Sequence, residues 1–324
     1  MFNCKEILNR VNEFIATLEY EREPKALYTP ITYTLQQSGK RIRPVAMLLA
    51  YNLFDENIEK ALYPAVAMEV YHNYTLIHDD VMDKADIRRG KPTVWVKWGE
   101  NPAILSGDTM QVLAYEFIAR VADDKLRETL SLFTNMAKEI GEGQQFDMEF
   151  ETRNDVTEAE YINMIRLKTS VLIANCMKIG ALIAGASKED ADNLYAYGET
   201  VGLAFQLQDD LLDVYGDPKI FGKKIGGDIC CNKKTFLLIK ALETASPEQR
   251  KQMEELMAQE NFDPAEKIST FTSIYNQLGI KEICEKKIAE LFSDCDRYID
   301  AVSVPAERKE YIKQFADSLL NRIH

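Results

Sequence analysis

The 324-residue chain has little of what zinc proteins, disulfide-rich proteins and membrane proteins need. It contains three histidines and six scattered cysteines, with no C-x-x-C pair. These counts argue against a zinc site and a disulfide framework, so we expect reduced cytosolic thiols. The longest apolar run, Val171 to Ala186, is interrupted by Asn175 and Lys178. It is therefore too short and too polar to span a bilayer.

Basic residues are also in deficit. The chain has 39 Lys and Arg against 52 Asp and Glu, which gives a net charge of −13. This balance argues against a nucleic-acid partner bound through bulk charge. The stretch from Met1 to Tyr20 is polar and does not have the layout of a signal peptide, so we expect a cytoplasmic protein.

Strand signals and linkers are scarce as well. The segment Thr93–Trp98 alternates apolar and polar residues, but it is an isolated and weak strand signal. No Gly/Ser linker divides the chain. We therefore predict one all-α domain over residues 1–324, a bundle of about ten or more helices. Apolar residues at three- and four-residue spacing predict helices over Val45–Leu53, Ala61–His78, Pro102–Val121, Thr129–Glu142, Glu158–Ala186, Lys188–Val214, Ser246–Gln259, Ala265–Leu278, Lys281–Ala301 and Pro305–Arg322.

Two copies of the pattern D-D-x-x-D are the most informative feature of the chain. They occupy Asp79–Asp83 and Asp209–Asp213, and each follows an apolar helical run. The first and last acids of each copy are four residues apart, so they share one helix face. Like charges at this spacing destabilise a bare helix and call for a cation. Carboxylates suit Mg²⁺, which is usually shared with substrate phosphates. The pattern predicts a diphosphate held by magnesium between two helices.

Basic residues occur where such a diphosphate site would need them. Arginine binds phosphate oxygens with a two-pronged fork, and lysine acts as a point charge. Individually each of these residues fits an ordinary surface position, and their placement beside the acids favours a site. The basic candidates are Lys40, Arg43, Arg88, Arg89, Lys168, Lys223 and Lys233. Further polar candidates are His72, Gln144, Asp147, Thr169 and Gln206.

From Gly39 to Thr235 these ordered motifs resemble the trans-isoprenyl diphosphate synthases, the polyprenyl synthetase family. The resemblance implies the isoprenoid synthase fold, with helices around a deep central cavity, usually as a homodimer. It also implies a magnesium-dependent prenyltransferase that condenses isopentenyl diphosphate head to tail with an allylic diphosphate, dimethylallyl or geranyl. Two serines depart from the usual glycines of the family, Ser38 and Ser170. The chain also lacks the basic C-terminal signature of eukaryotic farnesyl synthases.

The resemblance also implies a role for each motif residue. The ligands of three magnesium ions, bound with the allylic diphosphate, would be Asp79, Asp83 and Asp209, supported by Asp80, Asp210 and Asp213. The contacts to the allylic diphosphate would be Arg88, Lys168 and Lys223, with Lys233 nearby. The isopentenyl diphosphate site would consist of Lys40, Arg43, His72 and Arg89. Thr169 and Gln206 would lie near the carbocation.

Residues just before the first aspartate motif bear on the length of the product. Tyr74 and Thr75 precede Asp79 by five and four residues, about 6–7.5 Å along a helix, and Tyr71 lies about 12 Å below it. In the family, bulk at this level limits chain length. Because Tyr74 is large and Thr75 is small, we favour farnesyl diphosphate, with geranylgeranyl diphosphate as the alternative. For Tyr71, an ordinary role in the core is an equal alternative.

Two other functions compete with this interpretation. A terpene cyclase or head-to-head coupling enzyme also uses aspartate-rich helices, but it would not need the isopentenyl diphosphate set that includes Lys40 and Arg43. A non-catalytic partner subunit of a hetero-oligomeric synthase commonly loses one aspartate motif, whereas both are intact here.

Overall fold

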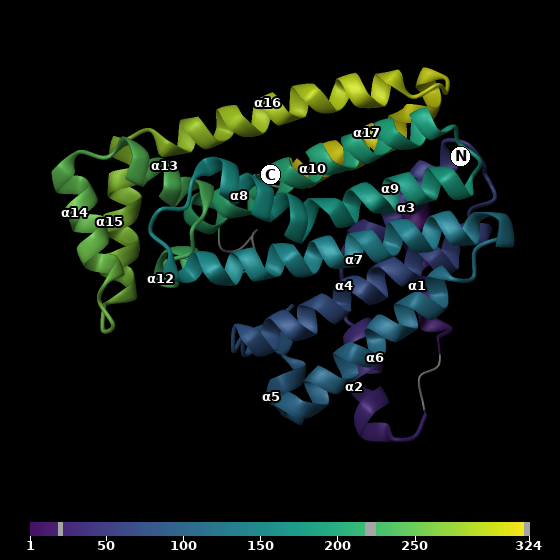
Figure 1. Cartoon of the computed structure of the whole chain (residues 1–324), viewed down its shortest axis with the longest axis horizontal. Helices are drawn as coiled ribbons and strands as arrows, with labels where there is room; N and C mark the ends of the chain where they lie inside the picture. Colours follow the sequence, from purple (N-terminus) through teal and green to yellow (C-terminus); the bar gives the residue numbers. More distant parts are fainter. Residues whose placement is uncertain (19–21, 218–224, 321–324) are drawn as a thin grey trace. The chain divides into compact units, whose positions relative to one another are not determined.

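The structure is a computed structural model that describes residues 1–18, 22–217 and 225–320. These ranges are mainly helical (Figure 1). Their only strands are the two-residue β1 (Ile87–Arg88) and β2 (Lys91–Pro92), which pair antiparallel. The prediction of an all-α protein is confirmed. Within the same ranges, no helix is both long enough and apolar enough to cross a membrane.

The chain packs as two compact units, and each is described by itself. The first unit comprises Met1–Asn135, Asn175–Tyr195 and Val302–Ile312, and the second comprises Met136–Ala174, Ala196–Ala301 and Lys313–His324. The single domain predicted over residues 1–324 stays a prediction. Four helices contribute residues to both units: α7 (Asp123–Thr152), α9 (Val171–Ile183), α10 (Lys188–Tyr215) and α17 (Ala306–Leu320).

The first unit is built around α4, the helix that carries the first aspartate motif. Its first ten residues are buried except Tyr63, which explains why the run from Leu62 to Tyr71 is almost wholly apolar. Helix α6 packs beside it, and a Cβ atom at Gly107 of α6 would lie 2.4 Å from His78 Nε2. The elements of this unit are α1 (Cys4–Ala16), α2 (Lys25–Leu35), α3 (Ile42–Asn52), η1 (Ile58–Ala61), α4 (Leu62–Met82), α5 (Val94–Trp98) and α6 (Glu100–Ile118), with the two strands.

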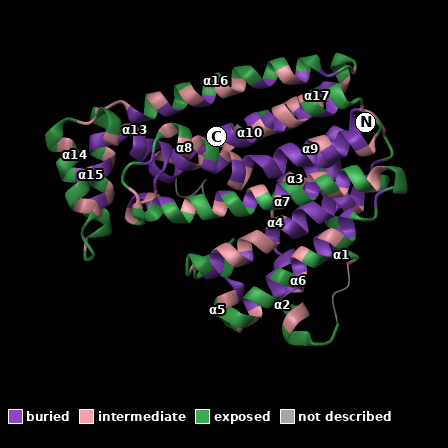
Figure 2. Cartoon of the chain, in the orientation of Figure 1, coloured by how far each residue is buried: buried purple, intermediate pink, exposed green. Residues whose placement is uncertain are grey.

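The second unit has a core of apolar residues from α8, α10, α13, α15 and α16. Two of its helices begin with a capping box. The side chains of Thr157 and Ser246 each accept from the backbone amide three residues on, and their own amides donate to the side chain of that residue. Figure 2 shows the contrast between the buried α9 and the largely exposed α14. The elements that lie wholly in the second unit are α8 (Glu158–Ile165), η2 (Arg166–Ser170), α12 (Gly227–Cys230), α13 (Phe236–Thr244), α14 (Pro247–Met257), α15 (Pro264–Gln277) and α16 (Ile280–Ala301).

Most predicted helices occur close to their predicted bounds, whereas α1, α2 and the short α12 lie outside the predicted ranges. Three further segments differ. The weak strand signal at Thr93–Trp98 is wrong, because the segment forms α5 against α6. Helix α7 continues ten residues past the predicted end at Glu142. The helix at Phe236–Thr244 was not predicted, because a short apolar run such as F-L-L-I does not distinguish a helix from a strand.

Candidate active site

The first aspartate motif closes α4. Asp79 is half-buried, and Asp83 is the exposed residue that caps the helix, with its amide bonded to the Asp79 carbonyl at 2.8 Å. Asp80 is only 4% exposed. Because successive helix positions are turned by about 100°, Asp80 is on a different side of α4 from the other two acids. The motif therefore presents one pair of accessible carboxylates and one buried carboxylate.

A tight hairpin brings an arginine to the buried acid. Arg89 and Gly90 both have positive φ, 52° and 73°, between the paired residues Arg88 and Lys91. Two such residues in a two-residue loop are typical of a type I′ turn. Arg88 donates to Asp80 Oδ1 from Nε and from its terminal nitrogen, each at 2.8 Å. Burial raises the pKa of Asp80, and the charge of Arg88 opposes this rise.

The residues predicted to bind isopentenyl diphosphate all belong to the first unit. Lys40 is exposed and Arg43 is half-buried at the start of α3. Burial, and then the charges of Arg43 and Arg89, hold the pKa of His72 well below its usual value. The imidazole is therefore neutral at pH 7 and can donate one hydrogen bond.

A buried polar network reaches Arg89, one of the residues predicted to bind isopentenyl diphosphate. The sequence did not predict this network. Arg41 adopts a left-handed backbone conformation with φ of 46° and is 5% exposed. It donates to Glu69 Oε1 at 2.7 Å and to the Leu35 and Gln37 carbonyls. Asn73 donates to Glu69 Oε1 at 3.0 Å and accepts from Arg89 at 3.4 Å. The signal in the sequence was Glu69, the one acid within an otherwise apolar run.

The aromatic residues below Asp79 form a cluster of edge-to-face pairs. The ring centroids of Tyr71 and Tyr74 are 5.2 Å apart, and those of Tyr71 and Phe133 are 5.4 Å apart. Phe133 of α7 also contacts Tyr115 of α6, with centroids 4.9 Å apart. Thr75 donates from its hydroxyl to the His72 carbonyl at 2.8 Å and adds little bulk. Sequence reasoning named Tyr71, Tyr74 and Thr75 and missed Phe133.

The second aspartate motif belongs to α10 and the second unit. Asp209 is half-buried, whereas Asp210 is 4% exposed. Asp210 accepts hydrogen bonds from the Tyr161 hydroxyl and, at 3.1 Å, from Gln206 Nε2. Burial, and then the charge of Asp228, raise the pKa of Asp210 to about 7. As in the first motif, the second acid is buried and bonded within its own unit.

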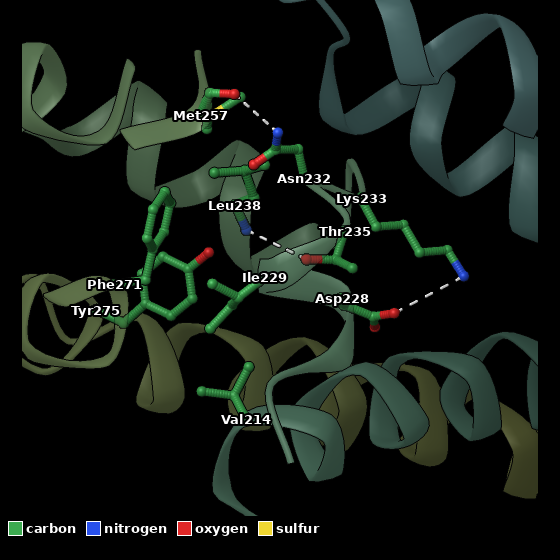
Figure 3. Close-up of a pocket in the computed structure, with 10 residues that line it drawn as sticks. All are labelled: Val214, Asp228, Ile229, Asn232, Lys233, Thr235, Leu238, Met257, Phe271 and Tyr275. Carbon is green, nitrogen blue, oxygen red and sulfur yellow. Dashed lines mark hydrogen bonds and ion pairs between the residues drawn. The ribbon is translucent and has the colours of Figure 1, made fainter. Parts of the chain in front are cut away.

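Asp213, the last acid of the second motif, organises the chain that follows. Its carboxylate accepts from the Asp228 amide at 3.0 Å, and its carbonyl accepts from the Gly226 amide at 2.6 Å. Lys233 lies 4.0 Å from an Asp228 oxygen, as the ion pair in Figure 3 shows. The small pocket in that view has a volume of about 10 Å³, room for about one water molecule. Lys223 lies outside the described residues.

Lys168 and Thr169 lie in η2, a π-helical turn, and such turns occur frequently at functional sites. Lys168 Nζ donates to Asp147 of α7 at 2.5 Å, a pairing that the sequence did not predict. The Thr169 hydroxyl donates to Gln206 at 3.2 Å, and Gln206 donates in turn to Asp210. A chain of hydrogen bonds thus joins the Lys-Thr turn to the second aspartate motif.

Two glycines, one in α7 and one in α10, allow these helices to pack closely against the π-helical turn. A Cβ atom at Gly143 of α7 would lie 2.4 Å from the Lys168 amide nitrogen and 2.8 Å from Leu167 C. A Cβ atom at Gly202 of α10 would lie 2.7 Å from Ser170 Cα. The backbone of the turn therefore packs against helix surfaces that have no side chain at these points. Sequence reasoning read glycines as breakers and did not assign these two.

The donor set suits a hard divalent cation. Asp79 and Asp83 offer carboxylate oxygens from one helix face, and Asp209 offers another in the second unit. In the described parts of the chain, no group of three or more His, Cys, Asp or Glu could hold a metal ion. Mg²⁺ is usually bound by one or two carboxylates plus substrate phosphates, so these residues fit it. That the two motifs share magnesium ions stays a prediction.

The chain is similar to known proteins over most of its length. The family model described as polyprenyl synthetase matches residues 24–276. A geranylgeranyl diphosphate synthase from Methanosarcina mazei is 44% identical over 243 residues, which cover 74% of this chain and 75% of that protein. One from Sulfolobus acidocaldarius is 35% identical over 316 residues, 96% of each chain. A crystal structure of a geranylgeranyl pyrophosphate synthase, 39% identical, matches with a TM-score of 0.95 over 100% of both chains.

Proposed function

This chain belongs to the polyprenyl synthetase family, and from that premise we propose that it makes geranylgeranyl diphosphate. Family membership makes it a transferase of the prenyltransferase type that acts on isoprenyl diphosphates. The observation that carries the product is that the three similar proteins described above are geranylgeranyl diphosphate synthases. The preference for the fifteen-carbon farnesyl product is not supported, and its twenty-carbon alternative fits better.

The residues below Asp79 are compatible with the longer product. Only one of the two positions directly before the motif is bulky, because Thr75 stands beside Tyr74. Tyr74 in turn rests on Tyr71, whose side chain is 2% exposed, so the next aromatic layer is fixed by packing. We propose that Tyr74 forms the level at which the twenty-carbon tail stops.

The reaction that we propose needs positioned charges rather than a nucleophilic side chain. The C–O bond of the allylic diphosphate ionises, the double bond of isopentenyl diphosphate attacks the allylic cation, and a new C–C bond forms. The proton lost in the last step goes to the released diphosphate. Arg88, Lys168, Lys223 and Lys233 would bind the departing diphosphate and stabilise the charge that develops on it. Magnesium, when bound, supplies further charge to the same group.

The second substrate, isopentenyl diphosphate, would bind to cationic side chains and a neutral imidazole of the first unit. Lys40, Arg43 and Arg89 would bind the isopentenyl diphosphate, and the neutral imidazole of His72 would donate a hydrogen bond to it. Asp79, Asp83 and Asp209 would bind magnesium ions together with the allylic diphosphate. The resemblance to the family implies three such ions. Thr169 and Gln206, which are hydrogen-bonded to each other, would lie near the carbocation.

The test is product analysis with labelled isopentenyl diphosphate and, in separate reactions, dimethylallyl, geranyl and farnesyl diphosphates. We expect all three starters to be elongated and the product to be geranylgeranyl diphosphate. Farnesyl diphosphate that accumulates without further elongation would overturn the proposed product. Turnover of farnesyl diphosphate without isopentenyl diphosphate would favour the cyclase or coupling enzyme, and an inactive purified chain would favour the partner subunit.

Two variants separate the proposed pockets. Arg43→Ala should mainly raise KM for isopentenyl diphosphate, whereas Lys168→Ala should mainly affect the allylic substrate. The loss of one charged hydrogen bond corresponds to a factor of about 10–100 in binding. Lys60→Ala, an exposed lysine of η1 that pairs with Asp55, is the control and should leave both constants unchanged. An equal effect of both variants on one substrate would contradict the two-pocket assignment.

We also propose a homodimer. Helix α6 exposes Leu105 at 57% and Val112 at 68%, seven residues apart and therefore on one side of the helix. Large apolar side chains exposed together in this way are typical of interaction surfaces. Light scattering on the purified protein should give twice the chain mass. Leu105→Glu combined with Val112→Glu should give the mass of one chain if this side of α6 forms the interface. The cytoplasmic location stays a prediction.

A further inference from the structure

Helices α14 and α15 follow the motifs and have no role in the function proposed above. Both reach back to one residue, Asn232. Its side-chain nitrogen donates to the carbonyl of Met257, at the end of α14, at 2.9 Å (Figure 3). Its side-chain oxygen accepts from Lys267 Nζ of α15 at 2.7 Å. Its own carbonyl accepts from Lys234 Nζ at 3.1 Å. Both polar groups of the side chain and the main-chain carbonyl are thus engaged.

Asn232 also has an unusual backbone. Its φ of 54° lies in the left-handed region, which asparagine and glycine tolerate better than other residues. The adjacent residue is Lys233, whose amide donates to the Asp228 carbonyl at 2.9 Å and whose carbonyl accepts from the Thr235 amide at 2.8 Å. The short turn from Asp228 to Thr235 therefore fixes where the backbone of Lys233 lies. The conformation of Asn232 sets the direction of that turn.

Lys267 is an unexpected residue for this position. Its side chain is 0% exposed, and its ammonium group lies 4.1 Å from the centre of the Phe262 ring. It also donates to the Cys230 carbonyl at 3.4 Å. Taking an ammonium group out of water is costly, and an apolar side chain of the same length would fill the space. What an apolar side chain would lack is the hydrogen bonds that the Lys267 ammonium group donates to the turn.

We propose that Asn232 and Lys267 are positioning residues, and that through them α14 and α15 hold Lys233 where it contacts the allylic diphosphate. This inference rests on the proposed function, in which Lys233 is such a contact. Lys267 acts from the protein side of the turn and does not touch the substrate. The buried Lys234 also donates to Asn232, at the main-chain carbonyl, and so helps to hold the same residue.

The test combines three variants with one control. Lys267→Met keeps the length of the side chain and removes its charge. Asn232→Gly keeps the left-handed backbone and removes both side-chain bonds. Asn232→Asp keeps the acceptor for Lys267. Lys251→Met is the control, because it makes the same chemical change at an exposed site of α14.

The first measurement is amide hydrogen exchange in magnesium-free protein, which does not depend on activity. In Lys267→Met and Asn232→Gly, the peptide spanning residues 228–235 should exchange on the order of tenfold faster, while peptides from α16 stay unchanged. Lys251→Met should exchange like the wild type. Asn232→Asp, which keeps the bond to Lys267 and loses the donor to the Met257 carbonyl, should lie between the wild type and Asn232→Gly. Faster exchange of α16 as well would mean a general loss of stability and would overturn the positioning role.

The second measurement is steady-state kinetics. Lys267→Met and Asn232→Gly should each raise KM for the allylic diphosphate by on the order of tenfold, with less effect on kcat. The double variant should be no worse than either single variant, because both changes break the same contact. Exchange and KM within about twofold of the wild type in both single variants would overturn the inference. A wild-type enzyme without prenyl transfer would instead refute the proposed function, and the exchange experiment would still test the pair.

Discussion

The contact between Gly143 and the π-helical turn allows a sharp test of how the turn is positioned. In Gly143→Ala, the new Cβ atom would lie 2.4 Å from the Lys168 amide nitrogen, whereas ordinary contacts begin at 3.4 Å. The atoms that it meets belong to backbone, so no side-chain rotation relieves the clash. The turn has to move away from α7 by several tenths of an ångström to about 1 Å. Lys168 and Thr169 move with it.

The expected change in stability of Gly143→Ala is the sum of two opposing effects. Replacing a helical glycine by alanine favours the helix by roughly 0.5–1 kcal/mol. Forcing an extra methyl group into a packed contact costs about 1–3 kcal/mol. We therefore expect a net destabilisation of about 1–2 kcal/mol at position 143. A displacement near 1 Å in a catalytic group can cost about 100-fold in rate, so kcat/KM for the allylic substrate should fall by about 10–100-fold.

The chain supplies a matched control two residues away on the same helix. A Cβ atom at Gly141 would have no atom within 4 Å, so Gly141→Ala should gain the helical term alone. Thermal unfolding should therefore show a higher melting temperature for Gly141→Ala and a lower one for Gly143→Ala. Steady-state kinetics should show wild-type kcat/KM in the control. If Gly143→Ala is as stable and as active as Gly141→Ala, the close packing of the turn has no functional consequence and the reasoning is wrong.

Three further predictions concern the aspartate motifs and the aromatic cluster. Asp79→Ala should lower kcat by on the order of 10²–10³-fold with an unchanged circular dichroism spectrum; near-normal turnover at saturating magnesium would refute its assignment. Tyr74→Ala, alone or with Tyr71→Ala, should lengthen the product by at least one five-carbon unit, and an unchanged product would mean that other residues stop the tail. In magnesium-free protein, the pKa of about 7 at Asp210 makes the folded state hold a proton that the unfolded chain has released, so the free energy of unfolding should fall as pH rises from about 4 to about 7. Asp210→Asn should weaken this dependence in thermal unfolding measured across that range, and an unchanged slope would contradict the pKa assignment.

The sequence was most informative where a pattern is local. The two aspartate motifs and the helices that carry them could be predicted because the four-residue spacing of Asp79 and Asp83 has a direct geometric meaning on a helix. The partners of the buried acids could not be predicted in the same way. Tyr161 precedes Asp210 by 49 residues, and no local pattern links them. Arg88 was a candidate because it follows the first aspartate motif closely, but the hairpin that carries it was not recognised.

Long-range contacts and short apolar segments account for the rest. The bond between Arg41 and Glu69 spans 28 residues, and a single buried acid in an apolar run is only a weak sign of it. Phe133 is one of many helical aromatics, and its contact with Tyr71 depends on how the first part of α7 packs within the first unit. Thr93–Trp98 alternates like a strand, yet packing against α6 makes it helical.

In both aspartate motifs the first and second acids differ in burial, which the pattern D-D-x-x-D alone does not reveal. In each motif the second acid is buried and bonded within its own unit, while the first stays half-buried. The partners differ in kind. Asp80 is paired with the charge of Arg88, which opposes the effect of burial on its pKa. Asp210 has the neutral donors Tyr161 and Gln206, and the charge of Asp228 adds to the effect of burial.

This difference has a consequence for how each motif is held in place. The charge of Arg88 favours the ionised form of Asp80 and so opposes the effect of burial on its pKa. An acid with a pKa of about 7 changes its charge near neutrality. The chain from Thr169 through Gln206 to Asp210 passes through that acid, so the state of Asp210 also affects the groups proposed to lie near the carbocation. The first motif is thus fixed by a charge pair, and the second by neutral hydrogen bonds whose acceptor strength depends on a proton.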